Sequence, residues 1–179
     1  MSRNGSGLGI HVDDPAHPPA RGQLRWLGLS VVLIALDQWS KQLIETHLNF
    51  MESREILPLF DLVRAHNRGV AFSMFNNSSG WQRWAFSGLA LVVSAALITW
   101  LARLERRLQL MAASLALILA GALGNLIDRL RQGWVVDFLQ VHWHEHYFPA
   151  FNVADSSITC GAVLLLLDAL LSSRQTHGR

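Results

Sequence analysis

Charge and cysteine are both scarce in this sequence. Charged residues make up 16% of the 179 residues and hydrophobic residues 51%, whereas roughly 25% of the residues of a soluble domain are charged. The single cysteine, Cys160, lies inside an apolar run, which excludes a disulfide framework and favours a small core residue. A formal net charge of +2 without a dense basic stripe does not suggest a nucleic-acid partner. No cleavable signal peptide is evident, because the first apolar run begins deep in the chain.

Apolar runs, in contrast, are abundant. Residues 1–23 are rich in Gly, Pro, His and Asp and are expected to form a disordered tail, followed by one membrane domain over 24–172 and a short cytoplasmic tail over 173–179. A membrane-spanning helix needs about 20 residues that are mostly apolar. Four segments approach this length: 24–43, 84–102, 108–127 and 154–172. The sequence therefore predicts an all-α membrane protein with four transmembrane helices.

Two connecting segments, 44–80 and 131–150, are expected to lie outside the membrane on the same side. Partial alternation of apolar and polar residues over 59–75, together with the turn signal Asn67-Arg68-Gly69, predicts short strands there. The short loop 103–107 carries three arginines, which places this loop and both termini in the cytoplasm. An aromatic belt then falls near the outer interface: Trp81, Trp84, Trp134 and Trp143.

This orientation gathers the polar side chains of the chain in the outer leaflet. They interrupt or flank the apolar runs at Asp37, Lys41, Asn67, Arg68, Asn125, Asp128, Arg129, Asp137, Asn152 and Asp155. Asp37 and Lys41 are four residues apart, a spacing that predicts an ion pair on one helical face. Asn125, Asp128 and Arg129 are also expected to share a face, with Arg129 as the partner of Asp128. Polar side chains within a membrane domain are candidates for function.

Two chemistries are suggested by the residue types in this region. Two neighbouring carboxylates share one proton, so that one can activate water while the other protonates a peptide carbonyl. Serine or cysteine chemistry is less favoured, because Ser156, Ser157 and Cys160 have no oriented base nearby in the sequence.

The run 142–146 is the only lead for metal chemistry. Its histidines, His142, His144 and His146, alternate with other residues, and a strand at the interface would place all three on one face. The spacing is not that of a His-Glu-x-x-His helix, so no metal site is expected.

Five motifs, in order along the chain, resemble those of the bacterial lipoprotein signal peptidase (signal peptidase II) family. They are Asp37-Gln38-Trp39-Ser40-Lys41, Asn67-Arg68-Gly69-Val70-Ala71-Phe72, Gly124-Asn125-Leu126-Ile127-Asp128-Arg129, Val135-Val136-Asp137-Phe138 and Phe151-Asn152-Val153-Ala154-Asp155. The resemblance covers about residues 24–172. Val70 stands where the family has alanine, a small change that affects only local packing.

The resemblance implies an aspartic endopeptidase of the bacterial inner membrane, with its active site near the periplasmic face. Such an enzyme needs no cofactor and removes the signal peptide of a prolipoprotein just before a diacylglyceryl-modified cysteine. The implied catalytic pair is Asp137 and Asp155. The supporting residues are Asp37, Lys41, Asn67, Arg68, Gly69, Asn125, Asp128, Arg129, Asn152 and Ala154. A small extracytoplasmic β-cradle and a short amphipathic helix would come from 44–75 and 131–150, and the expected partners are the lipid-modified substrate and membrane lipid, with the enzyme a monomer.

Without the resemblance, the residues leave several alternatives open. Spacing does not choose Asp137 over Asp128 as the catalytic partner of Asp155. The apolar neighbours of Asp137 nevertheless favour a carboxyl group that can gain or lose its proton. The polar cluster could also orient the helices only, or belong to a transporter or channel subunit. A transport path needs polar groups in both halves of the bundle, and the inner half has little beyond Asp168.

Overall fold

A computed structural model describes residues 22–69 and 80–177 of the chain. Its elements in chain order are a 3₁₀ turn at Leu24–Trp26, helix α1 at Leu27–His47, strands β1 at Ser53–Leu57 and β2 at Phe60–Asn67, helices α2 at Trp81–Arg103 and α3 at Gln109–Arg131, strands β3 at Val135–Trp143 and β4 at His146–Tyr147, and helix α4 at Val153–His177. Residues 1–21 of the predicted tail lie outside the described residues. The same is true of Val70, Ala71 and Phe72 in the second motif.

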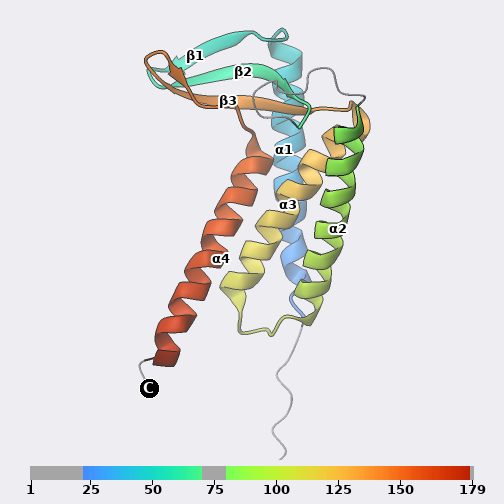
Figure 1. The fold of residues 1–179 in the computed structure, drawn as a ribbon, viewed down its shortest axis with the longest axis vertical. Helices are drawn as coiled ribbons and strands as arrows, with labels where there is room; N and C mark the ends of the chain where they lie inside the picture. Colours follow the sequence, from blue (N-terminus) through green and yellow to red (C-terminus); the bar gives the residue numbers. More distant parts are fainter. Residues whose placement is uncertain (1–21, 70–79, 178–179) are drawn as a thin grey trace, which may run out of the picture.

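The four long helices form one bundle with the sheet across one end (Figure 1). The end of α1, the start of α2, the end of α3 and the start of α4 all lie at the sheet end, as the sequence predicted. In the part of the chain that the structure describes, three helices are long and apolar enough to cross a membrane: α2, α3 and α4. Helix α1 is not among them, and it carries the charged residues Asp37, Lys41 and Glu45.

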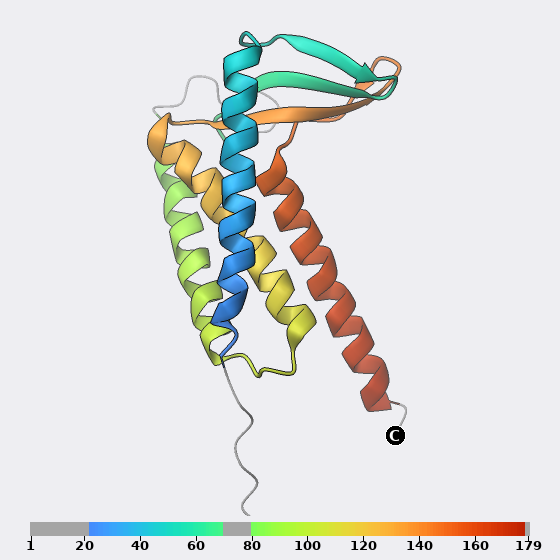
Figure 2. The ribbon, with the colours of Figure 1, turned by 180° about the vertical axis from the view of Figure 1, so that it is seen from behind.

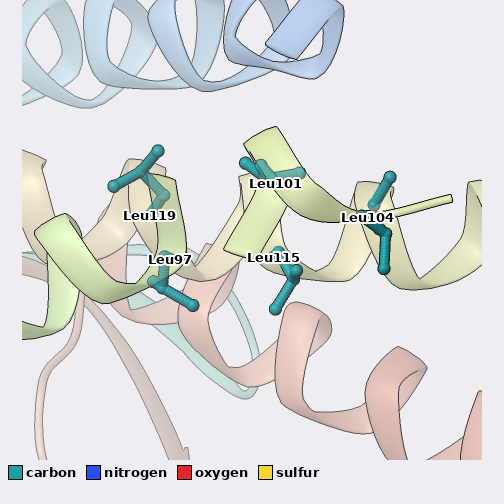
Figure 3. Packing of buried hydrophobic residues seen from close by; sticks show 6 residues of the cluster. Leu97, Leu101, Leu104, Leu115 and Leu119 are labelled. Atoms are coloured by element: carbon teal, nitrogen blue, oxygen red, sulfur yellow. The ribbon is translucent and has the colours of Figure 1, made fainter. Parts of the chain in front are cut away.

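The half of the bundle farther from the sheet, called the inner half below, is held together by leucine packing between α2 and α3 (Figure 1). Leu97, Leu101 and Leu104 pack against Leu115 and Leu119, all buried (Figure 3). Closer to the sheet, α3 and α4 approach so tightly that a Cβ at Gly121 would collide with the backbone oxygen of Ala154. Small residues permit such close contact between membrane helices, where packing rather than the hydrophobic effect drives association.

The segment before α1 closes the inner end of the bundle. Gln23 is fully buried, and its side-chain amide donates hydrogen bonds to the backbone oxygens of Glu105 (3.1 Å) and Arg106 (2.9 Å). The backbone N–H of Gly22 also donates to the backbone oxygen of Leu104 at 2.9 Å. Residues 22 and 23, which the sequence assigned to the tail, are therefore part of the packed structure.

The strands form an antiparallel sheet in the order β1-β2-β3-β4. The predicted strands are thus present, and Asn67 at the end of β2 lies opposite Val135 at the start of β3. No separate helix occurs within 48–69 or 132–150, so the described parts of these segments lack the expected amphipathic helix. The register between β2 and β3 is irregular between Leu62 and Ala65.

The histidine run 142–146 is not one strand, contrary to expectation. Trp143 pairs with His146, so the chain reverses at His144 and Glu145, and His144 has a positive φ of 51°. His142 therefore lies on β3 and His146 on β4, and the turn removes the single face that alternation would have given.

Candidate active site

The N-terminus of α4 fixes Asp155 through a reciprocal capping pair with Asn152. The backbone N–H of Asp155 donates to Asn152 Oδ1 (2.9 Å), and the backbone N–H of Asn152 donates to Asp155 Oδ2 (3.2 Å). This arrangement is a capping box, in which a polar residue before the helix and an acidic residue three positions later satisfy each other's N–H groups. The helix dipole favours a negative charge at this end, and the Asp155 side chain is only partly buried.

Asp137 approaches the same asparagine from β3. Its Oδ1 accepts a hydrogen bond from Asn152 Nδ2 at 2.7 Å, and its Oδ2 accepts one from Asn67 Nδ2 at 3.0 Å. The Asp137 side chain is almost fully buried. Burial, and then the nearby charge of Asp155, raise the pKa of Asp137 to about 7, although both asparagine amides oppose the rise. At neutral pH this carboxyl group can therefore either hold or release a proton.

Asn67 is itself oriented by the turn that follows it. The backbone N–H of Gly69 donates to Asn67 Oδ1 at 2.8 Å, which leaves the Asn67 amide free to face Asp137. Gly69 has φ of 92°, and a Cβ there would lie 2.6 Å from the Phe86 ring, so only glycine fits without rearrangement. Arg68, between these two residues, is exposed.

Lys41 is the centre of a buried ionic network next to Asp137 and Asp155. Its Nζ lies 2.7 Å from Asp37 Oδ2, 2.8 Å from Asp128 Oδ2 and 3.1 Å from Asn125 Oδ1. The predicted Asp37–Lys41 ion pair is thus confirmed. The other end of the Asn125 side chain donates to Asp155 Oδ1 at 2.7 Å, so Asn125 joins the network to the candidate site.

Asp37 contacts the start of α4 as well as Lys41. Its Oδ1 accepts a hydrogen bond from the backbone N–H of Ala154 at 2.8 Å, so two side chains, from Asn152 and Asp37, cap this helix. Gly124 allows the close approach, because a Cβ there would lie 2.7 Å from Asp37 Oδ2. The same Cβ would lie 3.3 Å from the Ala154 Cβ, so small residues on α3 and α4 face each other here.

The predicted pairing of Asp128 with Arg129 is wrong. Asp128 binds Lys41, and its Oδ1 accepts a hydrogen bond from Gln38 Nε2 at 2.8 Å. The Arg129 guanidinium instead lies over the Phe86 ring at 5.4 Å and donates to the backbone oxygen of Asn125 at 3.2 Å. Successive residues on a helix point in different directions, so neighbours in sequence do not face each other. Gln38 was missed, although its position three residues before Lys41 could have indicated it.

The serine, cysteine and histidine candidates of the sequence analysis have other surroundings. The hydroxyls of Ser156 and Ser157 donate to backbone oxygens one turn earlier, both at 2.9 Å, and Cys160 is exposed. His142 lies 3.3 Å from Asp61 on the outer part of the sheet.

Taken together, the geometry defines a class: a helical membrane protein with a carboxylate-bearing site at one end of its bundle. Comparison with known proteins then identifies the family. The model of the family described as "Signal peptidase (SPase) II" matches residues 29–171. A lipoprotein signal peptidase of Pseudomonas aeruginosa is 50% identical over 162 residues, covering 88% of this chain and 96% of the relative. One from Acinetobacter baylyi is 47% identical over 152 residues, covering 85% of each.

Solved structures agree with the sequence comparison. A bacterial membrane enzyme determined at 2.3 Å resolution has a TM-score of 0.75 and 30% identity, and the match covers 89% of this chain and 96% of that one. A second, at 1.9 Å, has the same TM-score with 29% identity. The chain belongs to the signal peptidase II family of membrane proteases.

Proposed function

We propose that this protein is an aspartic endopeptidase with Asp137 and Asp155 as its catalytic pair. It removes the signal peptide of diacylglyceryl-modified prolipoproteins by cleaving just before the lipid-modified cysteine. Membership of the family supports the reaction, and the position of the two carboxylates supports the assignment of the catalytic residues.

The observation that carries the assignment is that one buried residue, Asn152, hydrogen-bonds both carboxylates. Its side-chain amide contacts Asp137 at 2.7 Å and its backbone amide contacts Asp155 at 3.2 Å. Asp128, the alternative partner, instead binds Lys41 at 2.8 Å within the buried network. A carboxylate held in an ion pair is a poor proton carrier, whereas Asp137 has a pKa near that needed for acid–base work.

The environments of the two aspartates favour different roles. Asp137 holds the shared proton and transfers it to the oxygen of the scissile carbonyl as water attacks. Asp155, at the N-terminus of α4, accepts a proton from water, whose oxygen attacks the carbonyl carbon. When the resulting tetrahedral intermediate collapses, the proton on Asp155 passes to the leaving amine, the C–N bond breaks and Asp137 recovers its proton. No covalent intermediate and no cofactor are involved.

Four helices cross the bacterial inner membrane in this proposal, with α1 as the fourth span. The charges that lower the apolar character of α1 do not oppose this, since Asp37 and Lys41 are buried and paired inside the bundle. Both termini lie in the cytoplasm and the sheet end in the periplasm. The enzyme acts as a monomer, and its lipid-modified substrate enters sideways from the bilayer.

Cleavage assays with two forms of one prolipoprotein test the proposal. The purified enzyme, reconstituted in proteoliposomes, should cut the diacylglyceryl-modified precursor before its cysteine and cut the unmodified precursor far more slowly. Equal rates for the two forms would contradict entry of a lipid-modified substrate from the bilayer. If neither the modified nor the unmodified precursor were cleaved, the peptidase assignment would be contradicted.

A further inference from the structure

The outer end of the sheet carries a cluster of exposed apolar side chains that the proposed reaction does not use. We call this cluster the sheet tip; it consists of Leu57, Leu59, Val141, Trp143, Tyr147 and Phe148. Their exposed fractions range from 44% for Val141 to 70% for Trp143. Strand register explains the clustering, because Phe60 pairs with Val141 and the backbone N–H of Phe148 donates to the Val141 oxygen. The β1–β2 turn and the β3–β4 hairpin therefore lie side by side.

The sheet tip projects sideways from the bundle, just above the start of α4 in the view of Figure 1. Figure 1 and Figure 2, taken from opposite sides, both show the β1–β2 turn and the β3–β4 hairpin beyond α4. The opposite end of β2 and β3 carries Asn67 and Asp137 above the bundle. The same two strands thus connect the sheet tip to the candidate catalytic site.

The composition of the sheet tip is that of a membrane interface. Tryptophan and tyrosine are enriched where the acyl chains meet the headgroups, since their rings are apolar and each has one polar group. A second exposed aromatic pair, Trp81 (61%) and Trp84 (64%), lies at the start of α2, also at the sheet end. A protein partner would cover one patch, whereas a bilayer surface contacts separate patches at one level. Helix α4 also carries exposed apolar residues, such as Val163 and Leu166.

We propose that the sheet tip inserts into the boundary between headgroups and acyl chains of the outer leaflet, with the phospholipid surface itself as its occupant. Anchoring at the tip fixes the tilt of β2 and β3 relative to the bundle. The height of Asp137 above the membrane then depends on two supports, the helices below it and the lipid beside them.

Spin labels at matched positions in one strand test this insertion. In a Cys160→Ser background, a nitroxide is attached to Leu57→Cys at the tip end of β1 or to Ser53→Cys at its other end. Both positions are exposed, and they lie at opposite ends of the same strand. Phe148→Cys, on the other hairpin, provides a second tip position should Leu57→Cys fold poorly.

Collision rates in phospholipid nanodiscs are the readout, measured without substrate. The labels at 57 and 148 should collide more often with oxygen, which dissolves in lipid, than with a water-soluble nickel chelate, and the label at 53 should show the reverse. Nickel access at both tip positions equal to that at 53 would overturn the proposal. Dipolar broadening between labels would instead assign the tip to a second copy of the chain. Because no cleavage is measured, either result leaves the peptidase assignment independent of this test.

Discussion

The two ends of the helix bundle are stabilised in different ways. At the inner end, α2 and α3 are joined by leucines such as Leu101 and Leu115, which make no directional contacts. At the sheet end, buried Asp37, Lys41 and Asn125 are connected by hydrogen bonds and ion pairs of 2.7–3.1 Å. Apolar packing tolerates many substitutions of similar volume, whereas a buried polar network fails when one member is left without a partner.

This difference explains where function can reside. Buried charges are costly, and those among the described residues lie at the sheet end of the bundle or in the sheet itself. The sheet end has several, and they hold the start of α4 and the carboxylate of Asp155 in place. Substitutions at the sheet end should therefore alter chemistry or abolish folding, while those at the inner end should change stability alone.

The largest expected effect is on catalysis. Asp137→Asn and Asp155→Asn should each reduce cleavage by at least about 10²–10⁴-fold, the usual loss for a missing acid or base, because an amide can neither give nor accept the proton. Both variants should remain folded, since the change is nearly isosteric. The control is Asp168→Asn, at the other end of α4, which should keep its activity. Turnover near wild type in either of the first two variants would disprove the catalytic pair.

The next effect is on stability at the sheet end. Lys41→Met should destabilise the protein by about 3–5 kcal/mol, because Asp37 and Asp128 would be left as unpaired buried charges. Thermal unfolding in one detergent measures the loss. Arg107→Met removes an exposed ion pair at the inner end, where the arginine side chain is 79% exposed, and should cost at most about 1 kcal/mol.

Asp128→Ala sharpens the same test. It should lower stability as well as activity, with Lys41 rather than Arg129 losing one of its two carboxylate partners. A variant that is inactive but fully stable would move Asp128 from support into the chemistry.

At the inner end, Leu115→Ala should lower stability but not the activity of the folded enzyme. Leu115 is fully buried in the leucine cluster. The expected loss is about 2 kcal/mol, the low end of the range for soluble cores, because lipid is as apolar as the protein interior. Leu166→Ala, 66% exposed on α4, is the control and should be neutral. Loss of activity per folded molecule in Leu115→Ala would show that the two ends are coupled.

An effect of similar size is the pH dependence of stability that arises from Asp137. The pKa of this carboxyl rises from 3.8 to about 7 in the folded protein. The stability it contributes is therefore complete below the unfolded pKa and is lost as pH rises through about 7. At ~1.4 kcal/mol per pKa unit the loss is a few kcal/mol at most. Melting temperatures at pH 5 and pH 8 should differ less in Asp137→Asn than in the wild type, and equal differences would contradict the raised pKa.

Much of this organisation could be predicted from local sequence patterns. Uncharged runs predicted the helices, and the spacing of Asp37 and Lys41 predicted their ion pair, because both depend on residues within one helix. The partner of Asp128 could not be predicted this way, since Lys41 comes from another helix and spacing does not encode contacts between helices. The position of Asn152 between two carboxylates likewise requires β3 and α4 to meet in space.

The histidines of 142–146 give the smallest expected effect, which is none on activity. Alternation suggested one face of a strand, but the turn at His144 and Glu145 separates His142 from His146. His142 instead lies next to Asp61 at 3.3 Å, on the part of the sheet beyond the bundle. His144→Ala should therefore be tolerated, and dialysis against a strong chelator should leave cleavage of the lipid-modified precursor unchanged. If chelation abolished cleavage and zinc restored it, the conclusion that the histidines of the outer sheet take no part in the reaction would be wrong. His144→Ala would then show whether this turn supplies a ligand, because a ligand variant should resist rescue by zinc.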